Sequence, residues 1–307
     1  MKIVAFIVLF LSALTVKAES QPDLGTPYRV EKFNVTEKSP RIEVTTSGGH
    51  IYVVKESNDY VRVEMFVRKN GKSYTQKEMD LDDYSVVIQK MGNTIMAVAK
   101  SNKGFSMMNW DENYSIHFIV YTPRSINAEL KTSGGHIGLM GVEGVIDAKT
   151  SGGHINGEDM EGMLTVKTSG GHIELNQFEG QLEASTSGGH ITLNQVSGNL
   201  TFSTSGGHLR LNSVAGTING KTSGGNISGD IKSITSTCAL KTSGGNISIK
   251  LPSNEGYTIS ARGSLVRSSL SNFSGSTERD EITGSVRNGG SSVTLKTSGG
   301  VVTISEK

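Results

Sequence analysis

Apolar and polar residues alternate with a period of two in short runs along most of the chain. The segment 168–185 shows this clearly, because its apolar alternating residues are Ile173, Leu175, Leu182 and Ala184. A period of two is typical of β-strands with one buried face. The pair Gly170-Gly171 and the single Gly180 interrupt the alternation. They predict corners at which glycine adopts a positive φ at little cost.

The same pattern recurs at a fixed distance along the chain. The tetrapeptide Thr-Ser-Gly-Gly occurs nine times, starting at Thr46, Thr132, Thr150, Thr168, Thr186, Thr204, Thr222, Thr242 and Thr297. From Thr132 to Thr222 the starting position rises by the same step of 18 each time, then by 20, and finally by 55. One apolar column in these repeats contains Ile137, Ile155, Ile173, Ile191, Leu209, Ile227 and Ile247. A unit of two or three short strands cannot bury its apolar face alone, so neighbouring units are expected to stack.

We therefore predict an all-β fold, a right-handed parallel β-helix or solenoid with 18-residue coils. Equivalent positions in neighbouring coils would lie about 4.8 Å apart along the axis, and crossover chirality favours the right-handed form. An antiparallel sandwich or barrel of short hairpins is the alternative, although hairpins do not require a fixed repeat length. The β-rich flanks are expected to cover the open strand edges at both ends of the stack.

Pattern and composition divide the chain into four segments. Lys2, an apolar run and small residues ending at Ala18 predict a cleaved signal peptide at 1–18, and hence a periplasmic or extracellular protein. No later segment is apolar enough to span a bilayer. The other segments are an N-terminal β cap with one coil-like segment at 19–125, a β-solenoid of 18–20-residue repeats at 126–250, and C-terminal closing strands at 251–307. The Ser-rich stretch 264–280 is expected to be a loop.

Charge and cysteine content narrow the possible partners. The formal net charge is +1, and removal of 1–18 would take away Lys2 and Lys17 and no acid, which gives −1. A protein that binds nucleic acid would show a basic excess, so nucleic acid is not expected as a partner. The single Cys238 excludes a disulfide framework. The two-residue insertion in its repeat places this thiol in the inward column of Leu182.

The repeated Thr-Ser-Gly-Gly-(His/Asn)-Ile, with Lys or a small residue before it, resembles the bacterial putative-adhesin domain family of unknown function. The resemblance extends from about Phe33 to Ile304 and includes Asn288-Gly289-Gly290 before the final strand pair. It implies a β-solenoid similar to the head domains of putative autotransporter adhesins, and it carries over no catalytic residue. Many members have Asp or Asn after the glycine pair, whereas this chain has His in six of its nine copies.

Five histidines that follow glycine pairs would form a ladder along one outer edge of the stack. These candidate binding residues are His136, His154, His172, His190 and His208. Neighbouring imidazoles could share a Zn²⁺ or Cu²⁺ ion, or they could oppose one another's protonation and create a pH-sensitive edge. Surface packing of a turn-closing polar residue is the favoured interpretation, because Asn226 and Asn246 occupy the same column. No cofactor is expected.

Stacked carboxylates are the second candidate chemistry. Glu143, Glu161 and Glu179 share one column before a corner glycine, where they could bind Ca²⁺ or act on a polysaccharide as acid and base. The column continues as Ser197 and Ala215, and no Arg or Asp is expected beside it. A glycosidase needs two carboxylates in distinct environments. A solvated turn face is therefore the favoured interpretation, and no enzymatic activity is expected.

Together these features favour an exported, non-enzymatic envelope or surface protein, an adhesin that recognises an extended ligand such as a glycan. Outward positions such as Glu174, Thr192 and Arg210 would offer repeated weak contacts that add by multivalency. Two alternatives stay open: a polysaccharide-active β-helix enzyme, and a structural or signalling envelope component with a protein partner. An exposed apolar patch would favour the protein partner, and the residues from Phe105 to Trp110 are the candidates for it. The sequence does not indicate an oligomeric state.

Overall fold

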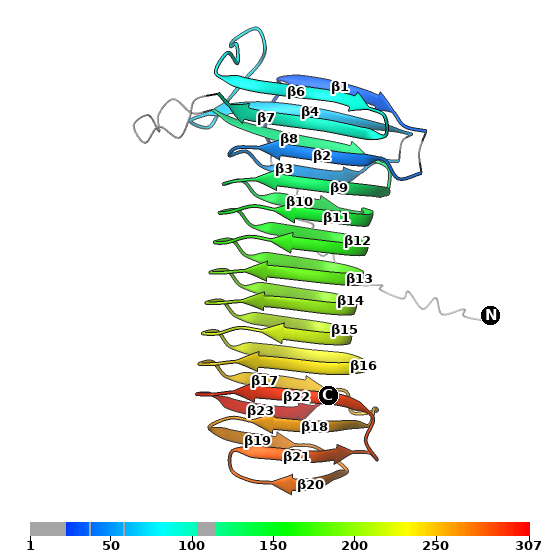
Figure 1. Ribbon diagram of the computed structural model, residues 1–307, viewed down its shortest axis with the longest axis vertical. Helices are drawn as coiled ribbons and strands as arrows, with labels where there is room; N and C mark the ends of the chain where they lie inside the picture. Colours follow the sequence, from blue (N-terminus) through cyan, green and yellow to red (C-terminus); the bar gives the residue numbers. More distant parts are fainter. Residues whose placement is uncertain (1–22, 37, 58, 103–113) are drawn as a thin grey trace, which may run out of the picture.

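The computed structural model describes residues 23–36, 38–57, 59–102 and 114–307, and these residues form 23 strands and no helix. They accordingly contain no helix that could cross a membrane. The predicted signal peptide at 1–18 and the apolar stretch from Phe105 to Trp110 lie outside the described residues. All strands belong to one hydrogen-bonded sheet, which Figure 1 shows as a tall stack.

The strands fall into three groups along the sequence. The N-terminal strands are β1 (Arg29–Asn34), β2 (Arg41–Thr46), β3 (Ile51–Lys55), β4 (Tyr60–Lys69), β5 (Lys72–Tyr74), β6 (Tyr84–Met91), β7 (Thr94–Ser101) and β8 (Ser115–Thr122). The middle strands are β9 (Ser125–Thr132), β10 (Ile137–Met140), β11 (Glu143–Lys149), β12 (Ile155–Lys167), β13 (Ile173–Thr186), β14 (Ile191–Thr204), β15 (Leu209–Lys221) and β16 (Ile227–Thr242). The C-terminal strands are β17 (Ile247–Leu251), β18 (Tyr257–Arg262), β19 (Leu265–Ser269), β20 (Phe273–Thr277), β21 (Glu281–Val286), β22 (Ser291–Thr297) and β23 (Val301–Glu306).

The middle of the stack is parallel and in register at the repeat length. Ile155 on β12 is the Cα partner of Ile173 on β13, which in turn partners Ile191 on β14. These partners are one repeat apart in sequence, as the fixed spacing predicts. The parallel pairing excludes the alternative of stacked antiparallel hairpins for this region, because hairpin neighbours run in opposite directions.

The apolar columns form a continuous core inside the stack. Ile155, Ile173 and Ile191 are fully buried, and burial of each such side chain contributes about 1.5–3 kcal/mol. Cys238 is also fully buried and pairs with Ile218, in the column that contains Leu182. The inward position predicted for this thiol is therefore confirmed, and burial raises its pKa to about 12.

The corners follow the prediction only in part. Gly180 has a positive φ of 137°, as expected, and its counterparts in other repeats are Gly144, Gly162, Gly198 and Gly216. Three residues earlier, Gln177 adopts a left-handed φ of 58° although it is not glycine. The pairs such as Gly170-Gly171 do not have positive φ, so that part of the prediction is wrong. At the second position of these pairs, glycine is required by the close approach of the neighbouring turn and not by the backbone conformation.

At both ends the order of strands in the stack departs from their order in the chain. β7 and β8 lie beyond β2 and β3, although β2 and β3 come first in sequence. At the other end, β22 and β23 lie between the β16–β17 pair and the β18–β19 pair. Antiparallel strands cover the outer edges (Figure 1), with β4 beside β8 and β21 beside β18. The stretch 264–280 contributes β19 and β20, so the loop expected there is wrong.

Candidate functional site

The Thr-Ser-Gly-Gly turn sets the position of every histidine in the candidate edge. The buried hydroxyl of Thr168 donates a hydrogen bond to the carbonyl oxygen of Gly153 in the preceding repeat, at 2.9 Å. It also accepts the backbone N–H of Gly171 in its own turn, at 3.2 Å. The threonine thus closes its turn and ties it to its neighbour, which leaves the next residue at a fixed place on the edge.

The second glycine of each pair is required by the close approach of neighbouring turns. A Cβ at Gly171 would lie 1.8 Å from the carbonyl oxygen of Gly153, well inside any allowed contact. A Cβ at Gly170 would meet no atom closer than 3.8 Å. The pair is therefore unequal: the second position excludes every side chain, and the first does not.

The five predicted histidines come together as one stack of imidazole rings. Neighbouring ring centroids from His136 to His208 are 4.8–4.9 Å apart, and adjacent rings are within 17° of parallel. His50 extends this stack, with its ring 4.8 Å from that of His136. The sequence-based expectation of a ladder along one edge therefore matches the arrangement of these side chains. Their use in binding stays a prediction.

Each imidazole in this histidine ladder accepts a backbone hydrogen bond. The N–H of His172 donates to Nδ1 of His154 at 2.8 Å, and the same bond recurs between every pair of neighbours from His50 to His208. Since Nδ1 accepts, the proton of each neutral ring is on Nε2. Asn226 and Asn246 continue the column because their Oδ1 atoms accept the same kind of bond, from Asn246 and Val301. His and Asn are thus equivalent here as acceptors.

Sequence reasoning missed one member of the ladder, His117. Its ring lies 4.7 Å from that of His50, and its Nδ1 accepts the N–H of His50 at 2.9 Å. His117 is 4% exposed and begins the ladder at the N-terminal end. It follows Ile116 instead of a glycine pair, so the repeat motif does not identify it. The alternation of Ile116, Phe118 and Val120 around it was the available signal.

The buried end of the ladder favours neutral imidazoles. Burial lowers the pKa of His50 to about 4 and that of His117 to about 3, and a neighbouring imidazole and Arg68 act in the same direction. In the middle of the ladder the pKa of His190 is also lowered, first by burial and then by the adjacent rings. Protonation of Nδ1 would remove the acceptor of the next backbone N–H, so charging a ring also breaks the ladder.

This geometry favours hydrogen bonding over a shared metal ion. The rings of His154 and His172 are within 4° of parallel, so their Nε2 atoms point in the same direction and do not converge on one ion. Coordination through Nε2 would also place the ring proton on Nδ1, where the backbone N–H already donates. Across the residues that the structure describes, no three His, Cys, Asp or Glu side chains are arranged to hold a metal ion.

The carboxylate column has a basic partner, contrary to the prediction from the sequence. Arg124 contacts Glu143 at 3.0 Å, Asp159 at 3.2 Å and Glu161 at 3.8 Å. The statement that no Arg or Asp lies beside this column is therefore wrong, because Asp159 occupies a left-handed corner that brings it to the same edge. All three carboxylates share one guanidinium and are solvent-accessible, so no carboxylate is set apart as an acid.

The outward face beside the histidine ladder carries aligned polar side chains. Glu174, Thr192 and Arg210 are Cα partners on β13, β14 and β15, as predicted. Two residues further along these strands, the amide of Asn194 donates to Oδ1 of Asn176 at 2.6 Å. Asn212 donates to Asn194 in the same way, also at 2.6 Å. Side chains on this face thus recur at the strand spacing.

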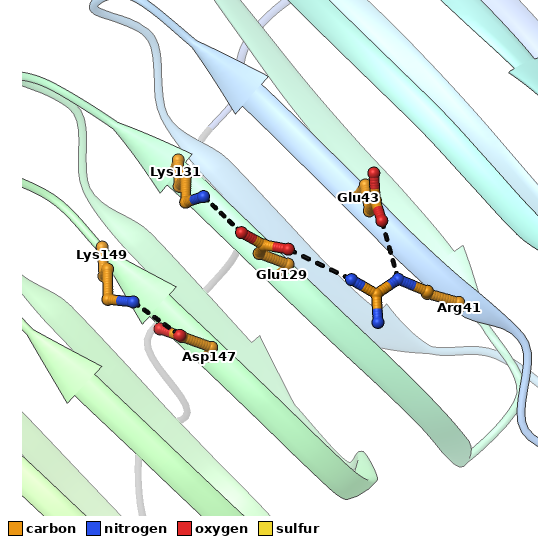
Figure 2. Close-up of polar contacts among 6 residues, drawn as sticks. All are labelled: Arg41, Glu43, Glu129, Lys131, Asp147 and Lys149. Carbon is orange, nitrogen blue, oxygen red and sulfur yellow. Dashed lines mark hydrogen bonds and ion pairs between the residues drawn. The ribbon is translucent and has the colours of Figure 1, made fainter.

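The other outward face carries ion pairs in its N-terminal half. Figure 2 shows the side chains of Arg41, Glu43, Glu129, Lys131, Asp147 and Lys149 on β2, β9 and β11. Arg41 contacts Glu43 at 2.7 Å on its own strand and Glu129 at 3.2 Å on the next strand. Lys131 contacts Glu129, and Lys149 contacts Asp147 at 2.6 Å. The charges on this part of the face are matched.

Several solved structures are similar to this chain at low sequence identity. No family model matches the chain, and no curated protein does. A putative adhesin from Bacteroides fragilis is similar at 15% identity and a TM-score of 0.44, over 91% of this chain and 96% of that one. A putative adhesin and a putative lipid binding protein, both from Parabacteroides distasonis, are similar at 12% and 15% identity, with TM-scores of 0.37 and 0.33. Each covers 91% of this chain, and 96% and 93% of the respective protein. At these scores the likeness carries no argument about function.

Proposed function

We propose that this chain is an exported, non-enzymatic surface protein, an adhesin that recognises an extended ligand such as a glycan, and that its stacked units form a right-handed parallel β-helix. One observation carries the proposal: outward side chains recur in register along a long stack, as at Glu174, Thr192 and Arg210. A polymer lying along the stack would meet a contact about every 4.8 Å. Weak contacts along one polymer add through multivalency.

The in-register parallel pairing supports the β-helix, and the usual chirality of parallel crossovers makes it right-handed. The non-enzymatic assignment follows from the carboxylates. Acid and base catalysis on a polysaccharide requires two carboxyl groups in distinct environments. Glu143, Asp159 and Glu161 instead share Arg124 at the surface.

The test is binding of the labelled protein, residues 19–307, to a glycan array and to cell-wall material at pH 7.5 and 5.5. We expect saturable binding that Arg210→Gln weakens several-fold. Arg41→Gln removes the same charge from the other outward face, and it is expected to leave this binding unchanged. A difference between the two pH values would implicate the histidine ladder, which lies beside Arg210.

Absence of saturable binding to any glycan or cell-wall fraction at either pH would contradict the proposal. Equal weakening by Arg210→Gln and Arg41→Gln would contradict the assignment of the binding face. The first result would favour an envelope component that binds another protein.

A further inference from the structure

Four basic side chains form one column near the C-terminal end of the stack. Lys221 on β15 is the Cα partner of Lys241 on β16, and Lys241 is that of Lys296 on β22. Lys296 is in turn the partner of Arg262 on β18. With neighbouring strands about 4.8 Å apart, the basic column spans roughly 14 Å. It exists only in the folded chain, because β22 lies between β16 and β18 in the stack.

The same position in the N-terminal half also carries lysines, but each of those has an acidic partner. Lys131 contacts Glu129, Lys149 contacts Asp147 at 2.6 Å, and Lys167 contacts Glu183 at 2.6 Å. In the basic column, the residues two positions earlier are uncharged: Asn219, Ala239, Thr294 and Ser260. Within the described part of the chain, none of the four basic side chains forms an ion pair.

The basic column lines a hollow of about 530 Å³ at the turns that end these strands. The remaining lining residues are Thr222, Thr242, Ser243, Gly263, Asp280, Thr297 and Ser298. Asp280 is the one acidic residue of the lining, and Glu281, the Cα partner of Arg262, lies next to it in sequence. Four cations against the carboxylates of Asp280 and Glu281 leave the hollow positively charged.

In the free protein, the four positive charges of the basic column repel one another. Like charges on adjacent strands repel one another, and Glu281 opposite Arg262 relieves this repulsion only at the β18 end of the column. A concave surface lined by one sign of charge also concentrates the field and attracts ions of opposite charge. Acid groups of a ligand would therefore supply the partners that Glu129, Asp147 and Glu183 supply in the N-terminal half. Ammonium and guanidinium groups bind carboxylates through charge-assisted hydrogen bonds.

We propose that this hollow binds an acidic polysaccharide through carboxylate groups spaced along the basic column. That the ligand is a glycan rests on the function proposed above, and that it is acidic rests on the unmatched charges. None of the lining residues is aromatic, whereas sites for single-stranded nucleic acid combine basic and aromatic side chains. The site uses side chains other than Glu174, Thr192 and Arg210, so the two surfaces are separable by mutation.

The test is titration of the protein, residues 19–307, with polygalacturonate, with dextran as an uncharged polymer, and with a single-stranded oligonucleotide. The double variant K241Q/K296Q removes two charges from the hollow. The matched control K131Q/K149Q removes two lysines from the paired half and changes the net charge equally. We expect polygalacturonate to bind, with affinity that falls between about 50 and 300 mM salt. K241Q/K296Q should lower this affinity roughly tenfold or more, and K131Q/K149Q less than about twofold.

Several results would overturn the proposal. They are equal losses in the two double variants, tighter binding of the oligonucleotide than of polygalacturonate, competition by dextran, and no binding of polygalacturonate at low salt. Unchanged thermal midpoints in both variants would show that the exposed substitutions leave the fold intact. If neutral glycans still bind on the array and Arg210→Gln weakens them, the proposed function stands and only this inference fails.

Discussion

Strand edges are paired in one way in the middle of the stack and in another way at its two ends. From β12 to β15, each repeat pairs with the one that follows it, and nearly every contact recurs once per repeat. At the ends the order of strands in the stack differs from their order in the chain. β2 lies between β7 and β9, and β22 lies between β16 and β18. A repeating unit always leaves an open edge. The ends therefore need interleaved and antiparallel strands, which the repeat itself does not encode.

The largest expected effect comes from the glycine contact that the middle and the N-terminal end share. A Cβ at Gly189 would lie 1.8 Å from the carbonyl oxygen of Gly171, and one at Gly49 would lie 1.8 Å from that of Ile116. Gly189→Ala and Gly49→Ala should each lower the free energy of unfolding by about 4 kcal/mol or more, because backbone atoms cannot yield. Urea denaturation measures this.

Gly188→Ala is the control, because its Cβ would meet no atom closer than 3.8 Å. It should change stability by no more than about 1 kcal/mol. If Gly49→Ala were as mild as Gly188→Ala, the requirement for glycine at this position would be confined to the middle of the stack.

The second-largest effect is expected where a large buried side chain packs against a small one, and it should distinguish the middle of the stack from its N-terminal end. Phe202 is buried opposite Gly220, where a Cβ would lie 2.5 Å from the phenyl ring. Phe202→Ala should cost about 3–5 kcal/mol, and adding Gly220→Val should recover part of that loss. Urea denaturation of the single and double variants gives the coupling. Phe118 at the N-terminal end faces Ile51 and Met65, so Phe118→Ala has no such rescue. Additive losses for Phe202→Ala and Gly220→Val would contradict the prediction.

Acid should destabilise the N-terminal end before the middle. His50 and His117 have pKa values of about 4 and 3 in the folded chain, below the ordinary 6.5. At a pH between the folded pKa of each histidine and 6.5, the unfolded chain binds more protons than the folded chain. Their contribution to stability is therefore complete above about pH 6.5, and it is lost as the pH falls toward 4 and then 3. His50→Asn keeps an acceptor without a titrating group, so it should flatten the dependence of the urea midpoint on pH.

His190→Asn provides the comparison in the middle of the ladder, where the ring is less buried and its pKa is also lowered. It should flatten the same curve less than His50→Asn. A larger effect of His190→Asn would show that the exposed rings, and not the buried end, carry the pH dependence.

The smallest effect is expected for the charged face that joins β2 to the repeats. The Arg41–Glu129 contact of Figure 2 links the end to the middle, and the two side chains are 50% and 35% exposed. Glu129→Gln also removes the contact with Lys131, and it should lower the thermal midpoint only slightly at low salt and by less at high salt. Thermal midpoints at two salt concentrations measure this. A salt-independent loss would indicate that packing of Glu129, and not its charge, joins the two regions.

The middle of the fold was predictable from sequence because its contacts are local in the repeat. Alternation predicted the buried columns, and the fixed spacing predicted that Ile173 pairs with Ile155 and Ile191. The insertion before Cys238 could be counted, and its burial followed. The order of β22 between β16 and β18 could not be predicted in this way. It depends on which strand edge the returning chain covers, and no residue spacing records that choice.

The candidate site shows the same division. The stack of His136 to His208 follows from the repeat, but the hydrogen bond from each N–H to the preceding Nδ1 depends on ring orientation. His117 was missed because it enters the ladder from outside the repeat. Arg124 reaches the carboxylates from the segment before the first uninterrupted repeat, and the basic column requires strand interleaving. Side chains supplied by different parts of the chain are the ones that spacing alone does not reveal.

The interleaved C-terminal end has a mechanical consequence. β23 is hydrogen-bonded to β17 along one side and to β19 along the other. Tension transmitted through this strand would load both ladders in shear, and many bonds would have to break together, whereas an edge strand can peel away one bond at a time. Resistance to force is set by the rate of unfolding and not by equilibrium stability. The strand order at this end therefore couples β23 to two neighbours, so that it leaves the stack only when both sets of backbone hydrogen bonds break.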